Sequence, residues 1–224
     1  MGVMGAESGT ADATSARPYR GLEPADRLAA RRSRLLAAGL DLLGSDEPVT
    51  VRGVCRRAGL AARYFYESFS EKDELVSAVF DSVIAELAAT TEAAVAAAPA
   101  REQTRAGMAN IVRTIAGDAR MGRLLFSVQP ANAVLVRKRA ESSALFAMLS
   151  GQHVGTALRV PENDRIKAAA HFVVGGVAQT IGAWLAGEVR LDSAELVDHL
   201  AALLDELADP ALYRAKGTSP AEKR

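Results

Sequence analysis

Residues 50–75 read TVRGVCRRAGLAARYFYESFSEKDEL, and the pattern of this segment is the most informative in the chain. Thr50 is suited to open a helix that runs to about Ala58, because a threonine side chain accepts a hydrogen bond from the unpaired N–H groups of a helix start. Gly59 is suited to end that helix, since glycine readily takes the left-handed conformation of a C-cap. A second short helix over about 61–68 would follow directly. The pattern predicts a helix–turn–helix.

The second of these helices carries a cluster of rings, since positions 64–69 hold Tyr64, Phe65, Tyr66 and Phe69 in a chain with few aromatic residues. At about 100° per residue, Phe65 and Phe69 share one face, whereas Arg63 and Tyr64 lie on the opposite arc. Tyr66 lies at the boundary. We expect the phenylalanines to anchor the helix, and Arg63 and Tyr64 to face outward, where a groove-reading helix carries long polar side chains.

Periodicity alone leaves two interpretations open: a packed helical hairpin with an exposed arginine, or a DNA-binding motif. The distribution of charge bears on this choice. The whole chain has a net charge of zero, but residues 17–72 hold 11 basic and 7 acidic residues, a net charge of +4. A local positive excess is expected where one region meets an anionic partner.

Residues 50–75 resemble the DNA-binding signature of TetR-family transcriptional regulators, without a gap. In that family a threonine or serine opens the first helix of the motif, as Thr50 does here, and glycine with an aliphatic residue makes the turn, as at 59–60. The recognition helix ends in Tyr-x-x-Phe, which Tyr66 and Phe69 match. A lysine stands three residues later, which Lys72 matches. The resemblance implies an all-α regulator that binds double-stranded operator DNA.

The DNA-binding residues that the resemblance predicts are Thr50, Arg52, Ala62, Arg63, Tyr64, Tyr66 and Lys72. Carried over by position, Thr50, Tyr66 and Lys72 are expected to contact phosphates. Base edges are expected to be read by Arg63 and Tyr64. Arginine can hold guanine with two hydrogen bonds, so Arg63 is the first candidate for specificity.

Some features near the recognition helix leave questions open. Arg52 is expected to support the base contacts. Arg27, Arg31 and Arg32 either add attraction for the DNA backbone or form an ordinary solvated face. Ala61 departs from the family, which often has serine or threonine after the turn. The recognition helix therefore lacks that side-chain cap, which puts its rigidity without DNA in question.

The rest of the chain is helical in its periodicity, with breaks at glycine, proline and aspartate. The expected helices span about 26–43, 51–58, 61–68, 70–97, 101–116, 119–127, 131–152, 162–188 and 193–208. We expect Ser70 and Asp73 to form a capping box at the fourth. The prediction is an all-α fold of about nine helices. Its parts are a disordered tail (1–24), a helix–turn–helix DNA-binding domain (25–72), an effector-binding and dimerisation domain (73–210) and a flexible tail (211–224).

The family resemblance implies that the C-terminal helices form a homodimer and enclose a ligand pocket. The predicted interface residues are Gly175, Gly176, Gly182, Leu196, Leu200, Leu203, Leu204 and Leu207, because mid-helix glycines permit close approach and the leucines form one stripe. The pocket candidates are Met108, Ile111, Met121, Leu125, Phe126, Phe146, Phe172, Gln179 and Trp184. They predict a small, mainly apolar effector held by a few polar groups. The alternative is that both sets of residues are ordinary core residues that pack within one subunit.

Residues 168–187 carry no formal charge and are long enough to span a bilayer. They are rich in alanine and glycine and contain His171 and Gln179, which favours an interface helix, so we predict no membrane partner. The single cysteine, Cys55, excludes an intramolecular disulfide and fits the cytoplasm. A buried structural role for Cys55 is favoured over a redox switch.

No motif for catalysis or for a cofactor is present, and the three histidines do not have a metal-ligand spacing. We therefore predict a protein that is not an enzyme and has no cofactor. The most concrete prediction is a cytoplasmic, homodimeric repressor that an effector releases from a palindromic operator. The alternatives are an activator, or a helical ligand-binding or scaffold protein with weakened DNA binding.

Overall fold

The computed structural model of the chain describes residues 24–45, 47–126, 132–158 and 163–213. Within those ranges the chain forms nine α-helices and two short 3-10 helices, with no strand. The all-α prediction is thereby confirmed. The tails predicted at 1–24 and 211–224 lie outside the described residues, apart from Pro24 at the start of the first helix and residues 211–213.

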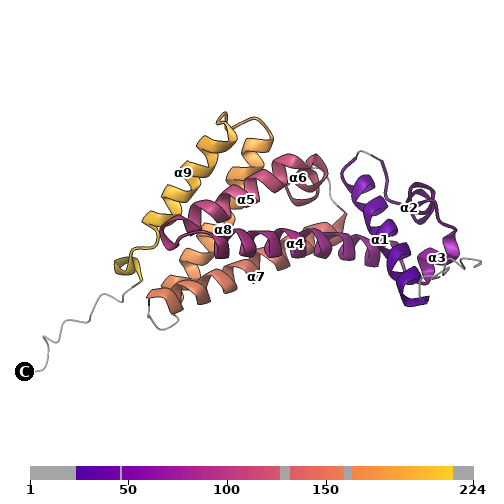
Figure 1. Cartoon of the computed structure of the whole chain (residues 1–224), viewed down its shortest axis with the longest axis horizontal. Helices are drawn as coiled ribbons and strands as arrows, with labels where there is room; N and C mark the ends of the chain where they lie inside the picture. Colours follow the sequence, from indigo (N-terminus) through magenta and orange to yellow (C-terminus); the bar gives the residue numbers. More distant parts are fainter. Residues whose placement is uncertain (1–23, 46, 127–131, 159–162, 214–224) are drawn as a thin grey trace, which may run out of the picture.

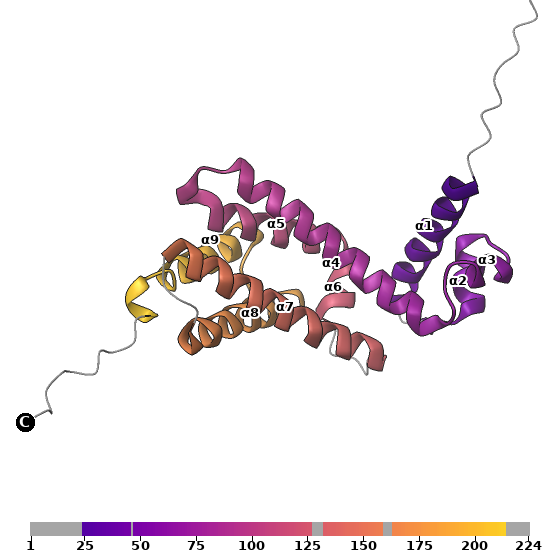
Figure 2. The same ribbon diagram turned by 90° about the horizontal axis from the view of Figure 1, so that it is seen from below.

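Three helices form a small head at one end of the molecule (Figures 1 and 2). They are α1 (Pro24–Leu43), α2 (Val51–Ala58) and α3 (Ala62–Tyr66). Each buries apolar side chains in a shared core that includes Leu35, Leu42, Val54, Phe65 and Phe69. The apolar faces of α1 and α2 are therefore buried, as their amphipathic periodicity predicts.

Helix α4 (Lys72–Ala97) runs from the head into the rest of the molecule (Figures 1 and 2). It begins two residues later than predicted, and its N-cap Glu71 makes no side-chain capping bond, so the predicted Ser70–Asp73 capping box is wrong. The reason is that Ser70 donates its backbone N–H and its hydroxyl to the Glu74 carboxylate, at 2.6 and 2.8 Å.

The head core continues into α4, because Leu75, Val76, Val79 and Phe80 are buried in the same apolar cluster as the α1–α3 side chains. The predicted domain boundary at residues 72 and 73 therefore falls inside a continuous core. Because the head and the first turns of α4 share this core, we expect the head to move together with the start of α4.

The larger body consists of α4 with five further helices. These are α5 (Gln103–Gly117), which follows the 3-10 turn Ala100–Glu102, then α6 (Ala119–Phe126), α7 (Ala133–Leu158), α8 (Asp164–Leu185) and α9 (Ser193–Glu206). Helix α5 packs between α4 and α9, α7 packs along α8, and α6 contacts both α1 and α8. A second core gathers Val112, Ile115, Ile181, Leu196 and Leu200.

Among the described residues, α8 is the one helix whose length and composition would suit a membrane span, with a mean hydropathy of 1.3. In this structure it packs against α7 and α6, and 11% of its most apolar window is buried. Its apolar residues are therefore divided between a side that packs within the chain, where Ile166 and Ile181 are buried, and a side where Phe172 is exposed.

Candidate DNA-binding surface and effector cavity

The turn between α2 and α3 has the geometry that Thr50 and Gly59 predict. Thr50 is the N-cap of α2, and its Oγ1 accepts a hydrogen bond from the Gly53 N–H at 3.0 Å. Gly59 is the C-cap, with φ of 63°, a left-handed conformation that favours glycine. The next N–H, that of Leu60, donates to the Cys55 carbonyl at 3.0 Å. The chain therefore leaves α2 in a defined direction and enters α3 after the three residues 59–61.

Helix α3 is held by its phenylalanines. Phe65 and Phe69 are 0% and 2% exposed, and their ring centroids lie 5.6 Å apart. Ala61, the N-cap, makes no side-chain capping bond, as its alanine predicts. Burial of two rings can contribute several kcal/mol, which is more than the roughly 1 kcal/mol of a missing cap. Packing against the head therefore supports the short helix.

Arginines of α1 also fasten the motif. Arg34 donates from Nη2 to the Ala58 carbonyl at 2.6 Å, at the end of α2. Arg32 donates from Nη1 to the Ser68 carbonyl at 2.8 Å, just beyond α3, and its guanidinium lies 4.3 Å from the Phe69 ring centroid. Both groups meet carbonyls at helix ends, where positive charge is favoured. Arg32, considered above either for attraction to the DNA backbone or as part of a solvated face, holds the end of the recognition segment.

Tyr64 contacts two arginine side chains. Arg63 donates from Nη2 to the Tyr64 hydroxyl at 2.6 Å, and the guanidinium carbon atoms of Arg63 and Arg31 both lie 4.6 Å from the Tyr64 ring centroid. Arg31 is also paired with Glu67, with Nη2 and Oε2 2.9 Å apart. Arg31 therefore orients Tyr64, and Tyr64 orients the exposed Arg63.

The other predicted DNA-binding residues lie around the same motif. Arg52 on α2 and Ala62 on α3 are exposed, and Thr50 is exposed at the start of α2. Tyr66 is 60% exposed and packs edge-on against Phe65, so it lies further out than the boundary position that its period predicts. Lys72 is half-buried at the first position of α4, with its Nζ 3.4 Å from the Asp73 carboxylate.

Helix α6 is tied to the head by two arginines. Arg120 bonds to Asp118 on its own segment and to Asp41 on α1. Arg123 donates from Nη1 to the Gly44 carbonyl, just after α1, at 2.6 Å. The backbone and side chain of Arg120 also approach Gly44 so closely that a Cβ there would meet them at 2.5–2.8 Å. Glycine at position 44 therefore permits the contact between α1 and α6.

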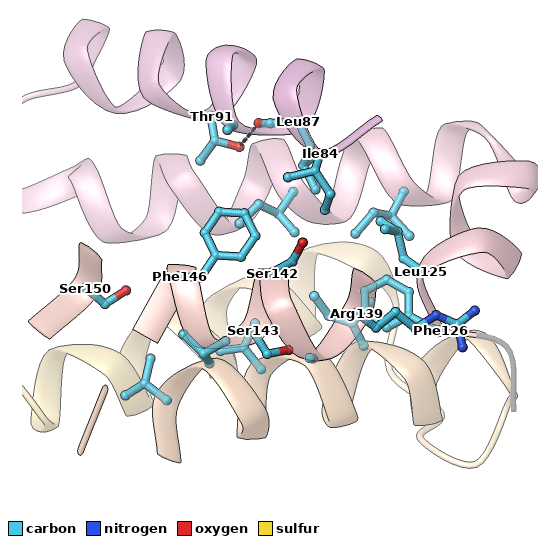
Figure 3. Close-up of a pocket in the computed structure, with 18 of the residues that line it drawn as sticks. Ile84, Leu87, Thr91, Leu125, Phe126, Arg139, Ser142, Ser143, Phe146 and Ser150 are labelled. Carbon is cyan, nitrogen blue, oxygen red and sulfur yellow. Dashed lines mark hydrogen bonds between the residues drawn. The ribbon is translucent and has the colours of Figure 1, made fainter. Parts of the chain in front are cut away.

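A cavity of about 430 Å³ lies in the body, within the range of small-molecule sites. Its walls come from α4, α5, α6, α7, α8 and α9, and most are apolar (Figure 3). The predicted residues that line it are Met108, Ile111, Leu125, Phe126 and Phe146. These positions were predicted from apolar spacing, and the structure brings them together around one space.

The remaining pocket candidates lie elsewhere. Met121 is buried in the head-side core, and Trp184 donates its indole N–H to the Leu191 carbonyl at 2.8 Å. Phe172 is 69% exposed and Gln179 is exposed. Their helix turns them away from the cavity, while Val173, Val174 and Val177 on the same helix face it. An apolar composition alone did not distinguish these faces of α8.

Sequence reasoning missed a polar stripe on α7. The lining residues Arg139, Ser142, Ser143 and Ser150 recur at helical spacing around the predicted Phe146 and face the otherwise apolar cavity (Figure 3). This spacing is visible in the sequence, but serine is common on solvated helix faces. The position of α7 against α8 and α4 makes the stripe part of the cavity wall, although Ser143 remains exposed.

Two lining groups are held by the surrounding protein. Arg139 is half-buried and donates from Nε and Nη2 to the Leu124 carbonyl at 3.0 and 2.6 Å, and burial lowers its pKa. Thr91 donates its hydroxyl to the Leu87 carbonyl at 2.7 Å and accepts from the buried Asn110 side chain at 3.0 Å. Asn110 in turn accepts from Arg113 at 2.6 Å. The cavity therefore has fixed polar groups.

The residues predicted for the dimer interface separate into two sets. Gly175 and Gly176 are exposed on α8, and a Cβ at either would meet no atom within 4 Å. Leu203 on α9 is half exposed. Leu196 and Leu200, by contrast, are buried in the core of the same chain, so their burial needs no partner.

The other three predicted positions also have contacts within the chain. A Cβ at Gly182 would lie 3.7 Å from Phe126. Leu204 lines the cavity, and the Leu207 carbonyl accepts a hydrogen bond from the Tyr213 hydroxyl. The leucine stripe of α9 therefore faces mostly inward, toward α5.

Cys55 is buried in the head core, and burial raises the pKa of its thiol. A raised pKa lowers the thiolate fraction, which makes a reactive cysteine less favourable. His171 and His199 are exposed, and the side chain of His153 lies outside the described residues. Where side chains are described, no group of three or more potential metal ligands comes together.

No protein-family model and no curated protein sequence matches the chain. Solved structures do match. A TetR-family transcriptional regulator from Streptomyces coelicolor is 19% identical, with a TM-score of 0.62 over 83% of this chain and 84% of that one. The regulator FadR from Bacillus subtilis, in complex with stearoyl-CoA, is 16% identical, with a TM-score of 0.60 over 77% and 96%.

NalD, the secondary repressor of the MexAB-OprM multidrug efflux pump in Pseudomonas aeruginosa, is 14% identical, with a TM-score of 0.59 over 80% of this chain and 96% of NalD. Many structural neighbours are TetR-family transcriptional regulators. At these identities the likeness concerns the fold: the chain folds as TetR-family regulators do.

Proposed function

We propose that this protein is a DNA-binding transcriptional regulator, most concretely a homodimeric repressor that a small, mainly apolar effector releases from a palindromic operator in the cytoplasm. The observation that carries the proposal is the presence, in one chain, of an outward-facing helix–turn–helix and a cavity of about 430 Å³ in the body. The structural neighbours, which are regulators, support the same reading.

Each α3 would enter a major groove with its N-terminal half toward the bases. Arg63 is exposed and would hold guanine with two hydrogen bonds, while Tyr64 would contact an adjoining base edge. Thr50, Tyr66 and Lys72 would contact phosphates, with Arg52 and Ala62 close to the DNA. Two copies of α3 would read half-sites about 34–36 Å apart, or a multiple of that spacing.

The two copies would meet through the exposed faces of α8 and α9. Phe172, Gly175, Gly176 and Leu203 offer apolar or small surface there. Exposed apolar surface of this kind is a common mark of an interface. Leu196 and Leu200 are no longer included, because they pack in the core of their own chain.

Binding in the cavity would act on the head through α4 and α6. Phe80 on α4 lines the cavity and also belongs to the head core. On α6, Leu125 and Phe126 line the cavity while Arg120 and Arg123 bond to α1 or to the residue after it. An effector shifts the orientation of the head only as far as it binds one arrangement of these helices better than the other.

The proposal is tested by selecting double-stranded DNA from a random pool with the full chain, and then measuring affinity for the selected site at several salt concentrations. We expect a palindromic site, bound by two chains, with affinity that falls steeply with salt. The double variant Arg63→Ala/Tyr64→Ala should remain folded but no longer enrich a specific DNA sequence from the pool. Failure of the natural chain to select any sequence would favour the ligand-binding or scaffold alternative.

The sign of regulation needs a separate measurement. A reporter gene placed behind the selected site should be expressed less when the protein is present. Increased expression would instead assign the activator role, with the DNA-binding part of the proposal intact.

A further inference from the structure

Arg31 on α1 reaches across to the recognition helix and contacts two of its residues. Its Nη2 lies 2.9 Å from the Glu67 Oε2, and its guanidinium carbon lies 4.6 Å from the centroid of the Tyr64 ring. Positions 64 and 67 are three apart, at the middle and the C-cap of α3, so they lie on the same side of it. One side chain from α1 therefore holds a ring and a carboxylate on one side of the recognition helix.

The Arg31 guanidinium is partly withdrawn from water. Its side chain is 26% exposed, and its Nε is buried without a hydrogen-bond partner among the described residues. An arginine over an aromatic ring is attracted by the negative face of the ring, and this attraction grows as the cation loses water. The planar guanidinium can lie over a ring while one of its edges pairs with a carboxylate. Arg31 therefore restrains the Tyr64 ring, and Glu67 restrains Arg31.

Tyr64 in turn holds the side chain of Arg63. The Tyr64 hydroxyl accepts a hydrogen bond from the Arg63 Nη2 at 2.6 Å, and the guanidinium carbon of Arg63 lies 4.6 Å from the centroid of the same ring. Arg63 is otherwise an exposed residue. A long exposed side chain loses conformational freedom when it binds, so a group that orders it beforehand lowers this cost. The Tyr64 ring therefore directs Arg63 before any DNA is bound.

The surroundings of Arg31 favour this positioning role over a direct contact with the DNA backbone. The charge of Arg31 is already paired with Glu67, and most of its side chain is covered. A cation gains most from a phosphate when it is exposed and its charge is not already paired. Arg27, one turn earlier on α1, is exposed. The two arginines therefore allow charge and positioning to be tested separately.

We propose that Arg31 determines base preference without touching a base: it holds Tyr64, and through Tyr64 it directs Arg63 to one position of each half-site. Arg31 is thus a positioning residue, and Glu67 keeps it in place. The inference rests on the proposed function, in which α3 reads a major groove. A contact with two hydrogen bonds distinguishes bases through its geometry, so a loosely held Arg63 would read the same base less strictly.

The test uses the full chain and the operator selected from the random DNA pool. The variant Arg31→Met/Glu67→Gln removes the ion pair and the cation over the ring, but it leaves the net charge of the chain unchanged. Affinities for a panel of single-base operator variants are measured at two salt concentrations. We expect the preference at the position that Arg63→Ala relaxes to fall by about 5-fold or more, with the other positions and the salt dependence unchanged.

Arg27→Met is the matched control, because it removes an exposed arginine four positions earlier on α1. Any loss of affinity in this control should be equal for all sequences and should flatten the salt dependence. If thermal unfolding shows that Arg31→Met/Glu67→Gln is not folded, Arg31→Lys replaces it. Lysine keeps the charge but has no planar group to lie over the ring, so the same position should lose preference.

A second background tests whether Arg31 acts through Tyr64. In the Tyr64→Ala chain, the added change Arg31→Met/Glu67→Gln should have little further effect on base preference, because the ring through which Arg31 acts is absent. An equal loss of preference with and without the ring would show that Arg31 does not act through Tyr64, and would overturn the inference.

Tyrosine ring signals in NMR spectra of the full chain without DNA report on the contact itself. The Tyr64 signals, assigned by their loss in Tyr64→Phe, should shift in Arg31→Met/Glu67→Gln, whereas those of Tyr66 should not. Unchanged Tyr64 signals would show that Arg31 does not hold the ring, which would also overturn the inference.

The outcomes separate this inference from the proposed function. Operator selection by the natural chain, with unchanged base preference in Arg31→Met/Glu67→Gln, would overturn the positioning role and leave the proposed function intact. A uniform loss of affinity with a flatter salt dependence would instead make Arg31 a phosphate contact. Failure of the natural chain to select any sequence would remove the proposed function and the specificity role with it, even where the Tyr64 signals shift.

Discussion

Helices α3 and α8 differ in how much of their stability is local. Helix α3 has five residues and no side-chain cap, yet Phe65 is fully buried beneath it. Helix α8 has 22 residues, and the Asn163 side chain caps it by accepting hydrogen bonds from two backbone N–H groups. Its Phe172 is nevertheless 69% exposed.

The intrinsic stability of a helix and its packing against the rest of the protein are therefore separate quantities. A helix as short as α3 is not stable alone in water, so it exists because the head holds it. Helix α8 has the length and capping of a good helix, but one of its faces has no neighbour in the described chain. The apolar face of α3 is buried within the chain, whereas we propose that the exposed face of α8 is buried by a second copy of the chain.

The largest expected effect on stability comes from replacing one phenylalanine in each helix with alanine. Phe65→Ala should destabilise the head by about 3–5 kcal/mol, because it opens a cavity beneath α3. Phe172→Ala should change the stability of the single chain little, since its side chain is mostly exposed. Denaturant unfolding at low protein concentration measures both. Equal losses of stability in the two variants would contradict the proposed difference in packing between α3 and α8.

The next effect tests whether α8 meets a second copy. Gly176→Leu adds a side chain where the single chain has open space, so the fold should remain. At a helix crossing the added side chain should cost about 1–3 kcal/mol per site, felt twice at a twofold interface. Sedimentation at low micromolar concentration should then show dissociation, with weaker operator binding.

Gly176→Ala is the matched control, because it removes the helix penalty of glycine and adds only a methyl group. A monomeric natural chain would contradict the dimer proposal. A Gly176→Leu dimer with normal operator binding would place this glycine outside the interface.

A third prediction separates the groups that α3 exposes from those at its edge. Arg63→Ala should relax base preference at one position in each half-site by about 1–3 kcal/mol, without loss of stability. Lys72→Ala should weaken binding to all sequences and flatten its salt dependence. Binding to a panel of single-base operator variants at two salt concentrations measures both. Exchange of the two outcomes would reverse the assigned roles.

The smallest expected effect lies at the contact of α6 with the head. Hydrogen bonds from the Arg120 side chain lower the pKa of Asp118 below its ordinary value of 3.8. A lowered folded-state pKa contributes stability above the ordinary value, and that contribution is lost as the pH falls through the lowered one. Asp118→Asn should therefore cost less than about 1 kcal/mol at neutral pH, since the pair is partly exposed.

The Asp118→Asn difference should shrink as the pH falls from 3.8 through the lowered pKa, toward a pH at which the natural carboxylate is also protonated. Unfolding curves at several pH values measure it. A difference that stays constant down to that pH would show that the effect of Asp118 is not electrostatic.

Much of the fold could be predicted from local pattern. The breaks at glycine, proline and aspartate place the nine helices, and the cap residues Thr50 and Gly59 determine the turn of the motif. The period of α3 likewise places Phe65 and Phe69 inward. These features depend on backbone propensities and on periodicity, which a sequence carries within a few residues.

The roles of other residues depended on which helix lies opposite. The sequence places Arg32 on a polar face of α1, but only the packing of α1 against α3 brings it to the Ser68 carbonyl. The stripe of α9 predicts one apolar face, but only the position of α5 turns Leu196 and Leu200 inward. Asp73 was expected to cap α4, and the competing bond of Ser70 to Glu74 decided otherwise.

The sequence by itself determined the helices, the turn at Gly59 and the ring face of α3, because these follow from contacts between residues a few positions apart. The tertiary structure alone decided that Arg139 and the α7 serines line a cavity, that Phe172 is exposed, and that α6 joins this cavity to α1. A helical period identifies a face but not its neighbour, since the neighbour is brought there by chain segments far away in the sequence.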